Sequence, residues 1–102
     1  MPNSWRDGLT DKLCDAFACL KTREEVYAFL EDVASINEIR SMSQRLEVAR
    51  LLSEGKKYPE VVHLTGASTA TISRVKKCLD YGAGGYDSVL KVMEHDKISQ
   101  SQ

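Results

Sequence analysis

The chain has 102 residues, of which 42% are hydrophobic, and its formal net charge is −1 at pH 7. This length and composition suit one domain with its own hydrophobic core, so we expect residues 1–102 to form a single domain. No apolar run approaches the roughly 20 residues that span a bilayer, and the first residues lack the apolar stretch of a signal peptide. We therefore expect a cytoplasmic protein with no membrane partner.

The three cysteines, Cys14, Cys19 and Cys78, are odd in number and form no C-x-x-C pair. No histidine stands at metal-ligand spacing from them. Neither a disulfide framework nor a metal site is expected, and the cysteines are better explained as buried or idle thiols.

Two amphipathic helices are predicted in the first third of the chain, after a loose start at about residues 1–4. The first is predicted by apolar residues that recur on one face: Leu9, Leu13, Phe17 and Leu20. The second begins at the T-x-x-E capping box of Thr22 and Glu25 and runs to about Val33.

A second capping box, formed by Ser35 and Glu38, opens the longest predicted helix, which runs to about Glu54 with Gly55 as its stop. Its apolar surface is broad and comprises Ile39, Met42, Leu46, Val48, Ala49, Leu51 and Leu52. A helix with so wide an apolar surface is typical of a central element that is contacted on more than one side, one of which a second subunit could cover.

Residues of about 58–80 are predicted to form a helix-turn-helix. Pro59 suits the first turn of a short helix, and Gly66 suits the turn after it. Ser68 can cap a second helix, whose inward stripe is Ile72, Val75 and Leu79. Short hydroxyl residues and cations remain on the other edge, a pattern typical of helices that enter the major groove of DNA. An ordinary helical hairpin with a solvated charged face has the same pattern, so the pattern alone leaves both interpretations open.

Positive charge is concentrated around this motif. From Arg40 to Leu79 there are eight cations and three anions, a net charge of +5, whereas the rest of the chain carries −6. A DNA-binding protein of nearly neutral overall charge needs such a segregated positive field, so this asymmetry favours nucleic-acid binding.

A Gly-rich run from Asp80 to Tyr86 is predicted to end the recognition helix after Leu79. The run lacks the strand and the GK[ST] ending of a phosphate-binding loop, so we interpret it as a hinge. Asp87 is expected to cap a last helix, and about residues 97–102 are expected to be loose.

The run LTGASTATISR, from Leu64 to Arg74, resembles the turn and recognition helix of the Trp repressor superfamily, which carry a G-A-x-x-A-T-I-[ST]-R run. The L-L-x-x-G ending of the preceding helix, Leu51 to Gly55, lies at nearly the same spacing as in that superfamily. The segments INEIRSMSQRLEVARLL and CLDYGAGGY are more closely similar to the YerC/YecD group of Trp-repressor-like bacterial proteins. The likeness covers about residues 5 to 95.

This resemblance implies an all-α chain of about six helices, whose first and last helices interlock with a second copy in an intertwined homodimer. Each subunit would present its recognition helix to one of two successive major grooves of a pseudo-palindromic site. The positions that match base-facing ones are Thr69, Ala70, Thr71 and Ser73. Together with the helix cap and the nearby cations, the candidate DNA-binding residues are Lys56, Lys57, Ser68, Thr69, Ala70, Thr71, Ser73, Arg74, Lys76 and Lys77.

Only some residues of the family's corepressor pocket have a match in this sequence. Arg45 and Arg74 match the two arginines that hold an indole in the archetype, and Thr71 matches a further pocket residue. Val75, however, stands where the archetype has a glycine that lets the ligand approach, and Cys78 replaces a serine. We therefore expect no L-tryptophan binding and no cofactor, and Arg45 is available to contact DNA or the edge of the core.

The function that we expect is a sequence-specific transcriptional regulator, a repressor, whose partner is double-stranded DNA. The alternative is a helical interaction protein that kept the fold without specific DNA reading, because no Arg, Gln or Asn stands at the start of the recognition helix. An enzyme is not expected: His63 has no arrangement of acid and serine near it in sequence that suggests nucleophilic catalysis, and the acids beside His95 are ordinary surface neighbours. No catalytic residue is therefore assigned.

Overall fold

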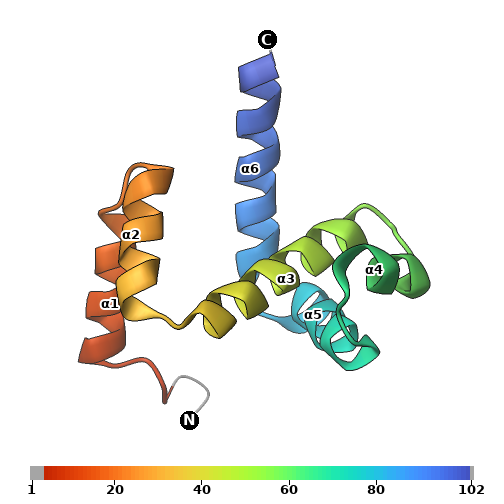
Figure 1. Cartoon of the computed structure of the whole chain (residues 1–102), viewed down its shortest axis with the longest axis horizontal. Coiled ribbons are helices and arrows are strands. Elements are labelled where there is room, and N and C mark those ends of the chain that lie inside the picture. The colour runs from red at the N-terminus through yellow and green to blue at the C-terminus, as the bar shows by residue number, and fades with distance from the viewer. Residues whose placement is uncertain (1–3, 102) are drawn as a thin grey trace. The chain divides into compact units, whose positions relative to one another are not determined.

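The computed structural model describes the backbone of residues 4–101 and the side chains of residues 4–96 (Figure 1). Within the described backbone there are six helices and no strand, which confirms the predicted all-α class. The helices are α1 (Gly8–Ala18), α2 (Arg23–Val33), α3 (Ile36–Ser53), α4 (Tyr58–Thr65), α5 (Thr69–Tyr81) and α6 (Gly85–Ser101). The expected loose ends at 1–4 and 97–102 lie largely outside the described residues, although the backbone of α6 is helical to Ser101. No described helix combines the length and the apolar character needed to cross a membrane.

The chain forms two compact units that divide inside α3, residues 1–39 and residues 40–102. That the chain is a single domain stays a prediction.

Side chains cap the helices of the first unit at the predicted positions. The Thr22 hydroxyl accepts the Glu25 N–H at 3.1 Å, and the Glu25 carboxylate accepts the Thr22 N–H at 3.0 Å. Ser35 and Glu38 make the same reciprocal pair at 3.1 and 2.7 Å, so both predicted capping boxes are confirmed. The backbone N–H groups of Lys21 and Thr22 lower the pKa of Glu25, because they stabilise the charged carboxylate. Asp7 caps α1 in the same way by accepting two backbone N–H bonds.

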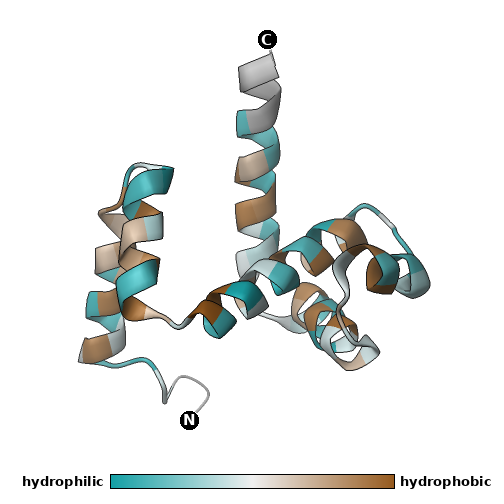
Figure 2. Ribbon diagram, viewed as in Figure 1, coloured by the Kyte–Doolittle hydropathy of each residue, from teal (hydrophilic) through white to brown (hydrophobic). Residues whose placement is uncertain are grey.

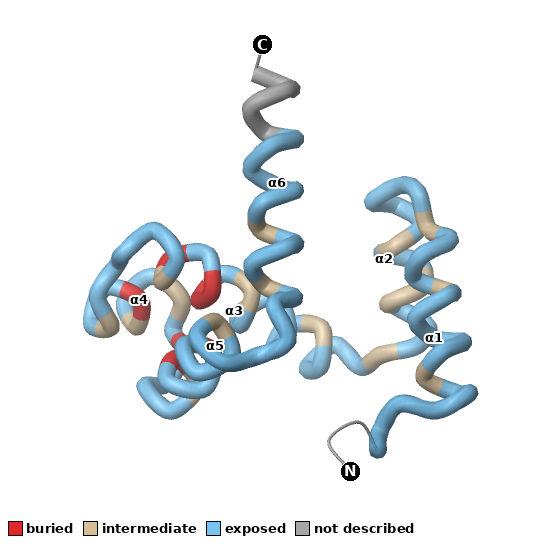
Figure 3. Tube along the Cα trace, turned by 180° about the vertical axis from the view of Figure 1, so that it is seen from behind, coloured by how far each residue is buried: buried red, intermediate tan, exposed pale blue. Residues whose placement is uncertain are grey.

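The first unit has well-formed helices but no buried side chain among its described residues (Figure 3). Phe17 of α1 and Phe29 of α2 meet edge to face, with ring centroids 5.1 Å apart and planes at 78°. Leu20, Val26 and Leu30 are half-buried. Six other large apolar side chains remain exposed, namely Trp5, Leu9, Leu13, Tyr27, Val33 and Ile36. Because a helical hairpin gains most of its stability by burying its apolar face, this unit needs a cover that it does not supply itself.

The core of the second unit lies beneath the helix-turn-helix. Seven residues are buried there: Val48, Ala49 and Leu51 of α3, Val61 of α4, Ala67 of the turn, and Ile72 and Val75 of α5. Tyr86 and Leu90 of α6 pack against this cluster. Apolar residues of α3, α4, α5 and the turn before α5 supply the buried positions (Figures 2 and 3). The predicted inward stripe of α5 is confirmed: Ile72 and Val75 are buried, and Leu79 is half-buried against the cluster.

Only the later part of α3 contributes buried residues. Met42 in its earlier part is 43% exposed, although it belongs to the apolar surface predicted for this helix. The helix stops at the predicted glycine: Gly55 has a φ of +87°, and the Lys56 N–H bonds to the Leu51 carbonyl at 3.1 Å. The three cysteines, Cys14, Cys19 and Cys78, are free and exposed, so none of them is a buried thiol.

The last two helices differ from their predicted bounds. The recognition helix α5 continues to Tyr81 and is capped at Gly82. Helix α6 then begins at Gly85, so the expectation that Asp87 caps it is wrong. Asp87 lies instead in the first turn, where its carboxylate interacts favourably with the positive end of the helix dipole. It also pairs with Lys91 at 2.9 Å.

Replacing a fully buried core residue should destabilise the second unit strongly. Ile72 is 0% exposed, so Ile72→Ala should lower the free energy of unfolding by about 2–5 kcal/mol through lost burial and the cavity left behind. Leu64→Ala, at a residue that is 56% exposed, is the control and should change it by less than about 0.5 kcal/mol. Urea denaturation followed by circular dichroism measures both, and equal effects would contradict the assigned core.

Candidate nucleic-acid interface

The turn between α4 and α5 is built as the sequence predicts. Gly66 adopts the left-handed conformation, with a φ of +72°, and its N–H bonds to the Val62 carbonyl at 2.8 Å. Ala67 is 2% exposed and anchors the turn in the core. The Ser68 hydroxyl then accepts the Thr71 N–H at 3.1 Å, which confirms the predicted cap of the recognition helix.

Polar contacts around Thr65 fix this turn further. The Thr65 hydroxyl donates to the Val61 carbonyl at 2.7 Å and accepts the Ala67 N–H at 3.1 Å. The Thr65 carbonyl accepts a hydrogen bond of 3.1 Å from the Nε2 of Gln44, which comes from α3. Neither Gln44 nor Thr65 could be recognised from the sequence, because no local motif links residues so far apart in the chain.

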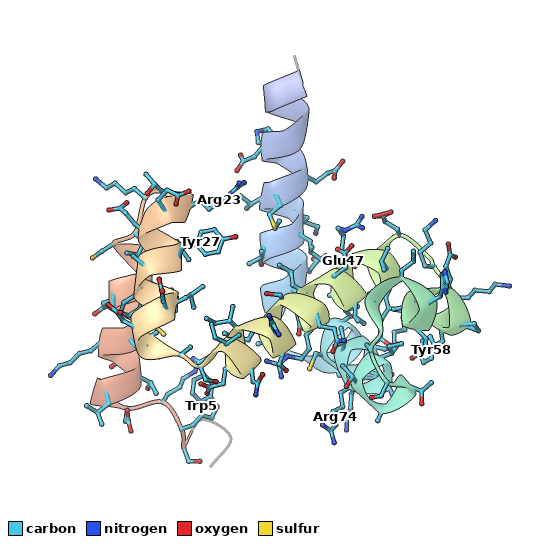
Figure 4. All side chains as sticks on the ribbon, in the orientation of Figure 1. Trp5, Arg23, Tyr27, Glu47, Tyr58 and Arg74 are labelled. Atoms are coloured by element: carbon cyan, nitrogen blue, oxygen red, sulfur yellow. The ribbon has the colours of Figure 1, made fainter. Side chains whose placement is uncertain are left out.

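Helix α5 presents a continuous accessible face opposite the core. Six of the predicted DNA-binding candidates are exposed on this helix: Thr69, Ala70, Ser73, Arg74, Lys76 and Lys77. Cys78, Asp80 and Tyr81, near the end of the helix, are also exposed. Arg74 projects away from the ribbon (Figure 4). Thr71 differs from these residues because it is half-buried and its hydroxyl accepts a hydrogen bond from the Ser68 hydroxyl at 3.1 Å. The hydroxyl of Thr71 is therefore less available to a base than those of Thr69 and Ser73.

Some of the predicted phosphate-binding cations are paired within the chain. Lys76 lies 3.3 Å from Asp80, and Lys56 lies 3.9 Å from Glu60. Lys57, Arg74 and Lys77 make no ion pair with any residue that the structure describes. Exposed ion pairs contribute only about 0–1 kcal/mol, so a phosphate group can compete for the paired lysines at a small cost.

Arg50 is held by two nearby carboxylates, one on its own helix, α3, and one just after the end of that helix. Its guanidinium bonds to both oxygens of Glu47 at 2.7 and 2.8 Å and also contacts Glu54. The hydrogen bond from Arg50 lowers the pKa of Glu47. Although Arg50 counts toward the positive segment of the sequence, its charge is largely neutralised by these neighbours.

The five residues of the possible effector pocket do not share one environment. Arg45 and Arg74 are exposed, whereas Val75 is 1% exposed and belongs to the core. Cys78 lines a cavity of about 450 Å³ whose lining includes none of the other four. That cavity is bounded by Leu46, Cys78, Gly82, Ala83, Gly84, Gly85, Tyr86 and Val89.

Among the described residues, no three His, Cys, Asp or Glu side chains gather in a way that could hold a metal ion. His63 is exposed in the last turn of α4.

Comparison with known proteins places the chain in a family. Residues 9–94 match the family model described as "Trp repressor protein". The chain belongs to the Trp repressor family. It is 50% identical over 93 residues to "Uncharacterized protein YerC" of Bacillus subtilis (strain 168), an alignment that covers 90% of this chain and 89% of that protein. The family consists of regulators with a helix-turn-helix rather than of enzymes.

Two solved structures of this family share the fold. A "putative Trp repressor" from Staphylococcus aureus is 43% identical, with a TM-score of 0.87 over 90% of this chain and 92% of that one. A "TrpR like protein" from Eubacterium eligens ATCC 27750 is 47% identical, with a TM-score of 0.86 over 90% and 95% of the two chains. The resemblance found in the sequence is confirmed by both comparisons.

Removing the partner of Lys76 should strengthen DNA binding. Asp80→Asn frees the ammonium group and removes a negative charge beside it, so affinity for a short random-sequence duplex should rise roughly fivefold at low salt. Asp87→Asn is the matched control, because it makes the same charge change in an i,i+4 aspartate–lysine pair on α6. Fluorescence anisotropy measures both affinities, and an equal rise for the two variants would place the DNA elsewhere.

Proposed function

We propose that the protein is a homodimeric, sequence-specific DNA-binding transcriptional regulator, a repressor, which acts in the cytoplasm through α4 and α5. The observation that carries the proposal is the accessible face of α5, a helix anchored in the core. On this face small side chains stand beside Arg74 and Lys77, which make no ion pair with a described residue. Such a face can approach base edges closely while long cationic side chains reach the phosphates on either side.

The exposed residues divide into two roles on chemical grounds. Thr69, Ala70 and Ser73 have short side chains, and they offer a methyl or hydroxyl group to the base edges of the major groove. Arg74 and Lys77 are the primary phosphate contacts, because they are exposed and have no ion pair with a described residue. Lys57, in the connection before α4, is a third phosphate contact.

The regulator works without L-tryptophan. At the position where the archetype of the family has a glycine, the Val75 side chain is packed into the core. An indole could not displace this side chain without opening the core beneath the recognition helix, and Cys78 supplies no hydroxyl to a ligand amine. Any small effector therefore has a chemistry other than that of tryptophan.

The homodimer is supported by the uncovered apolar surface of the first unit. Leu9 is 77% exposed, Val33 is 49% exposed and Ile36 is 59% exposed. Soluble proteins rarely leave large apolar surfaces open, and a two-fold pairing with a second copy would cover these side chains. Two-fold pairing also supplies two recognition helices for a pseudo-palindromic site.

A second candidate is a helical interaction module that does not read DNA sequence. The observation that favours it is a pair of exposed apolar side chains on the helix-turn-helix itself, Leu64 at 56% and Tyr81 at 84%. A stoichiometric complex with another protein, formed by a dimer that ignores DNA, would support this alternative.

Base-facing and phosphate-facing residues should respond differently to substitution. Lys77→Ala should weaken binding to all duplexes alike and reduce the slope of log affinity against log salt by about 1. Thr69→Ala should leave the salt slope unchanged and alter the preference between sites selected from random DNA. Electrophoretic mobility shifts over a salt series measure both effects. A wild-type protein with no preferred sequence at physiological salt would refute the proposed specific regulator.

The interface of the dimer should be sensitive to charge on the apolar face of α1. Leu9→Lys combined with Leu13→Lys should convert the dimer to a monomer, because both side chains are among those that a second copy would cover. Asp11→Lys combined with Asp15→Lys changes the charge more, on exposed positions of the same helix, and should remain dimeric. Light scattering coupled to size-exclusion chromatography gives the mass, and a monomeric wild-type protein would contradict the proposal.

A further inference from the structure

The helix-turn-helix is joined to α3 by two kinds of contact. The first is apolar packing of Val61, Ile72 and Val75 against Val48 and its neighbours on α3, which Figures 1 and 3 show as α4 and α5 lying against the later part of that helix. Apolar burial is strong but has no preferred direction, so by itself it tolerates small rotations and shifts of the motif on α3.

The second contact is directional. The side-chain amide of Gln44 donates to the carbonyl of Thr65 at 3.1 Å, across 21 positions of the sequence and in a part-buried setting. Thr65 is the last residue of α4, and the final carbonyls of a helix have no partner within it. Gln44 therefore satisfies a group that would otherwise be left open at the point where the chain turns toward the recognition helix.

Thr65, which Gln44 holds, is itself hydrogen-bonded to the turn. The hydroxyl of the same residue accepts the Ala67 N–H, and Ala67 is followed by Ser68, the cap of α5. Three residues separate the end of α4 from the start of α5, so the chain between the Gln44 contact and the recognition helix has little conformational freedom.

We propose that Gln44 is a positioning residue for DNA recognition: its amide fixes the angle at which α3 presents the turn, and thereby the recognition helix, to the groove. This inference rests on the proposed function, although the positioning itself can be tested without DNA. Gln44 acts through Thr65 and need not contact DNA.

Gln44→Met tests the inference because methionine keeps the length and volume of the side chain and removes the donor. Amide hydrogen exchange of the Ala67 N–H in the free protein should become roughly fivefold faster, the effect expected for one lost hydrogen bond. Exchange of the Ile72 N–H, in the core-facing part of α5, should change less. Asn37→Leu, which removes an exposed amide from the same helix, is the matched control and should leave the turn unchanged.

The DNA readout separates positioning from two simpler roles. If Gln44 positions the helix, the ratio of affinities for the selected site and for random DNA should fall roughly fivefold, while the salt slope stays the same. A purely structural role would lower stability but leave this ratio intact in folded protein. A direct phosphate contact by the uncharged amide would weaken binding to the selected site and to random DNA alike, with exchange at Ala67 unchanged. Either result would overturn the inference. Unchanged exchange at Ala67 would also overturn it. If the wild-type protein has no sequence preference, the proposed function fails, and the exchange measurement alone decides whether Gln44 holds the turn.

Discussion

The burial of one side of α5 against α3 is the constraint on which the rest of the structure depends. Ile72 and Val75 are almost fully buried beside Val48, Ala49 and Leu51. Because a helix has a fixed period of 3.6 residues, committing these two positions to the core determines which residues of α5 reach solvent. Thr69, Ser73, Arg74 and Lys77 are accessible for this reason. The candidate interface is thus a consequence of the core beneath it.

Features that depend on neighbouring residues could be predicted from the sequence. The capping boxes of α2 and α3, the stop at Gly55 and the turn at Gly66 all involve groups within five residues of one another, so a short stretch of sequence is enough to predict them. The start of α6 was predicted wrongly for a related reason: Asp87 is a good local cap, but packing of Tyr86 and Leu90 on the core favours a helix that already includes Gly85. Tertiary packing overrides a local preference at that point.

Contacts between distant segments could not be predicted in this way. Nothing near Gln44 in the sequence indicates that its amide reaches Thr65, because an uncharged polar residue on a broad apolar helix can face solvent equally well. Lys76 and Asp80 stand at i,i+4 spacing, which is typical of an ion pair on a helix, yet Asp80 lies one residue beyond the positive segment from Arg40 to Leu79. The same holds for the first unit. Its helices could be predicted from local sequence, but nothing in that sequence indicates which residues would cover Leu9 or Val33.

Position 75 has a different role in this chain from the one implied by the archetype of the family. The resemblance to the archetype of the family places there a glycine that lets a ligand approach the helix. In this chain the Val75 side chain is buried instead, and full burial of a valine is worth about 1.5–3 kcal/mol, so it stabilises the packing of α5 on the core. The turn is held in addition by Gln44 and Thr65, both of which belong to the chain itself. The orientation of α5 is thus held by contacts within the chain, namely the buried side chain of Val75 and the hydrogen bonds of Gln44 and Thr65.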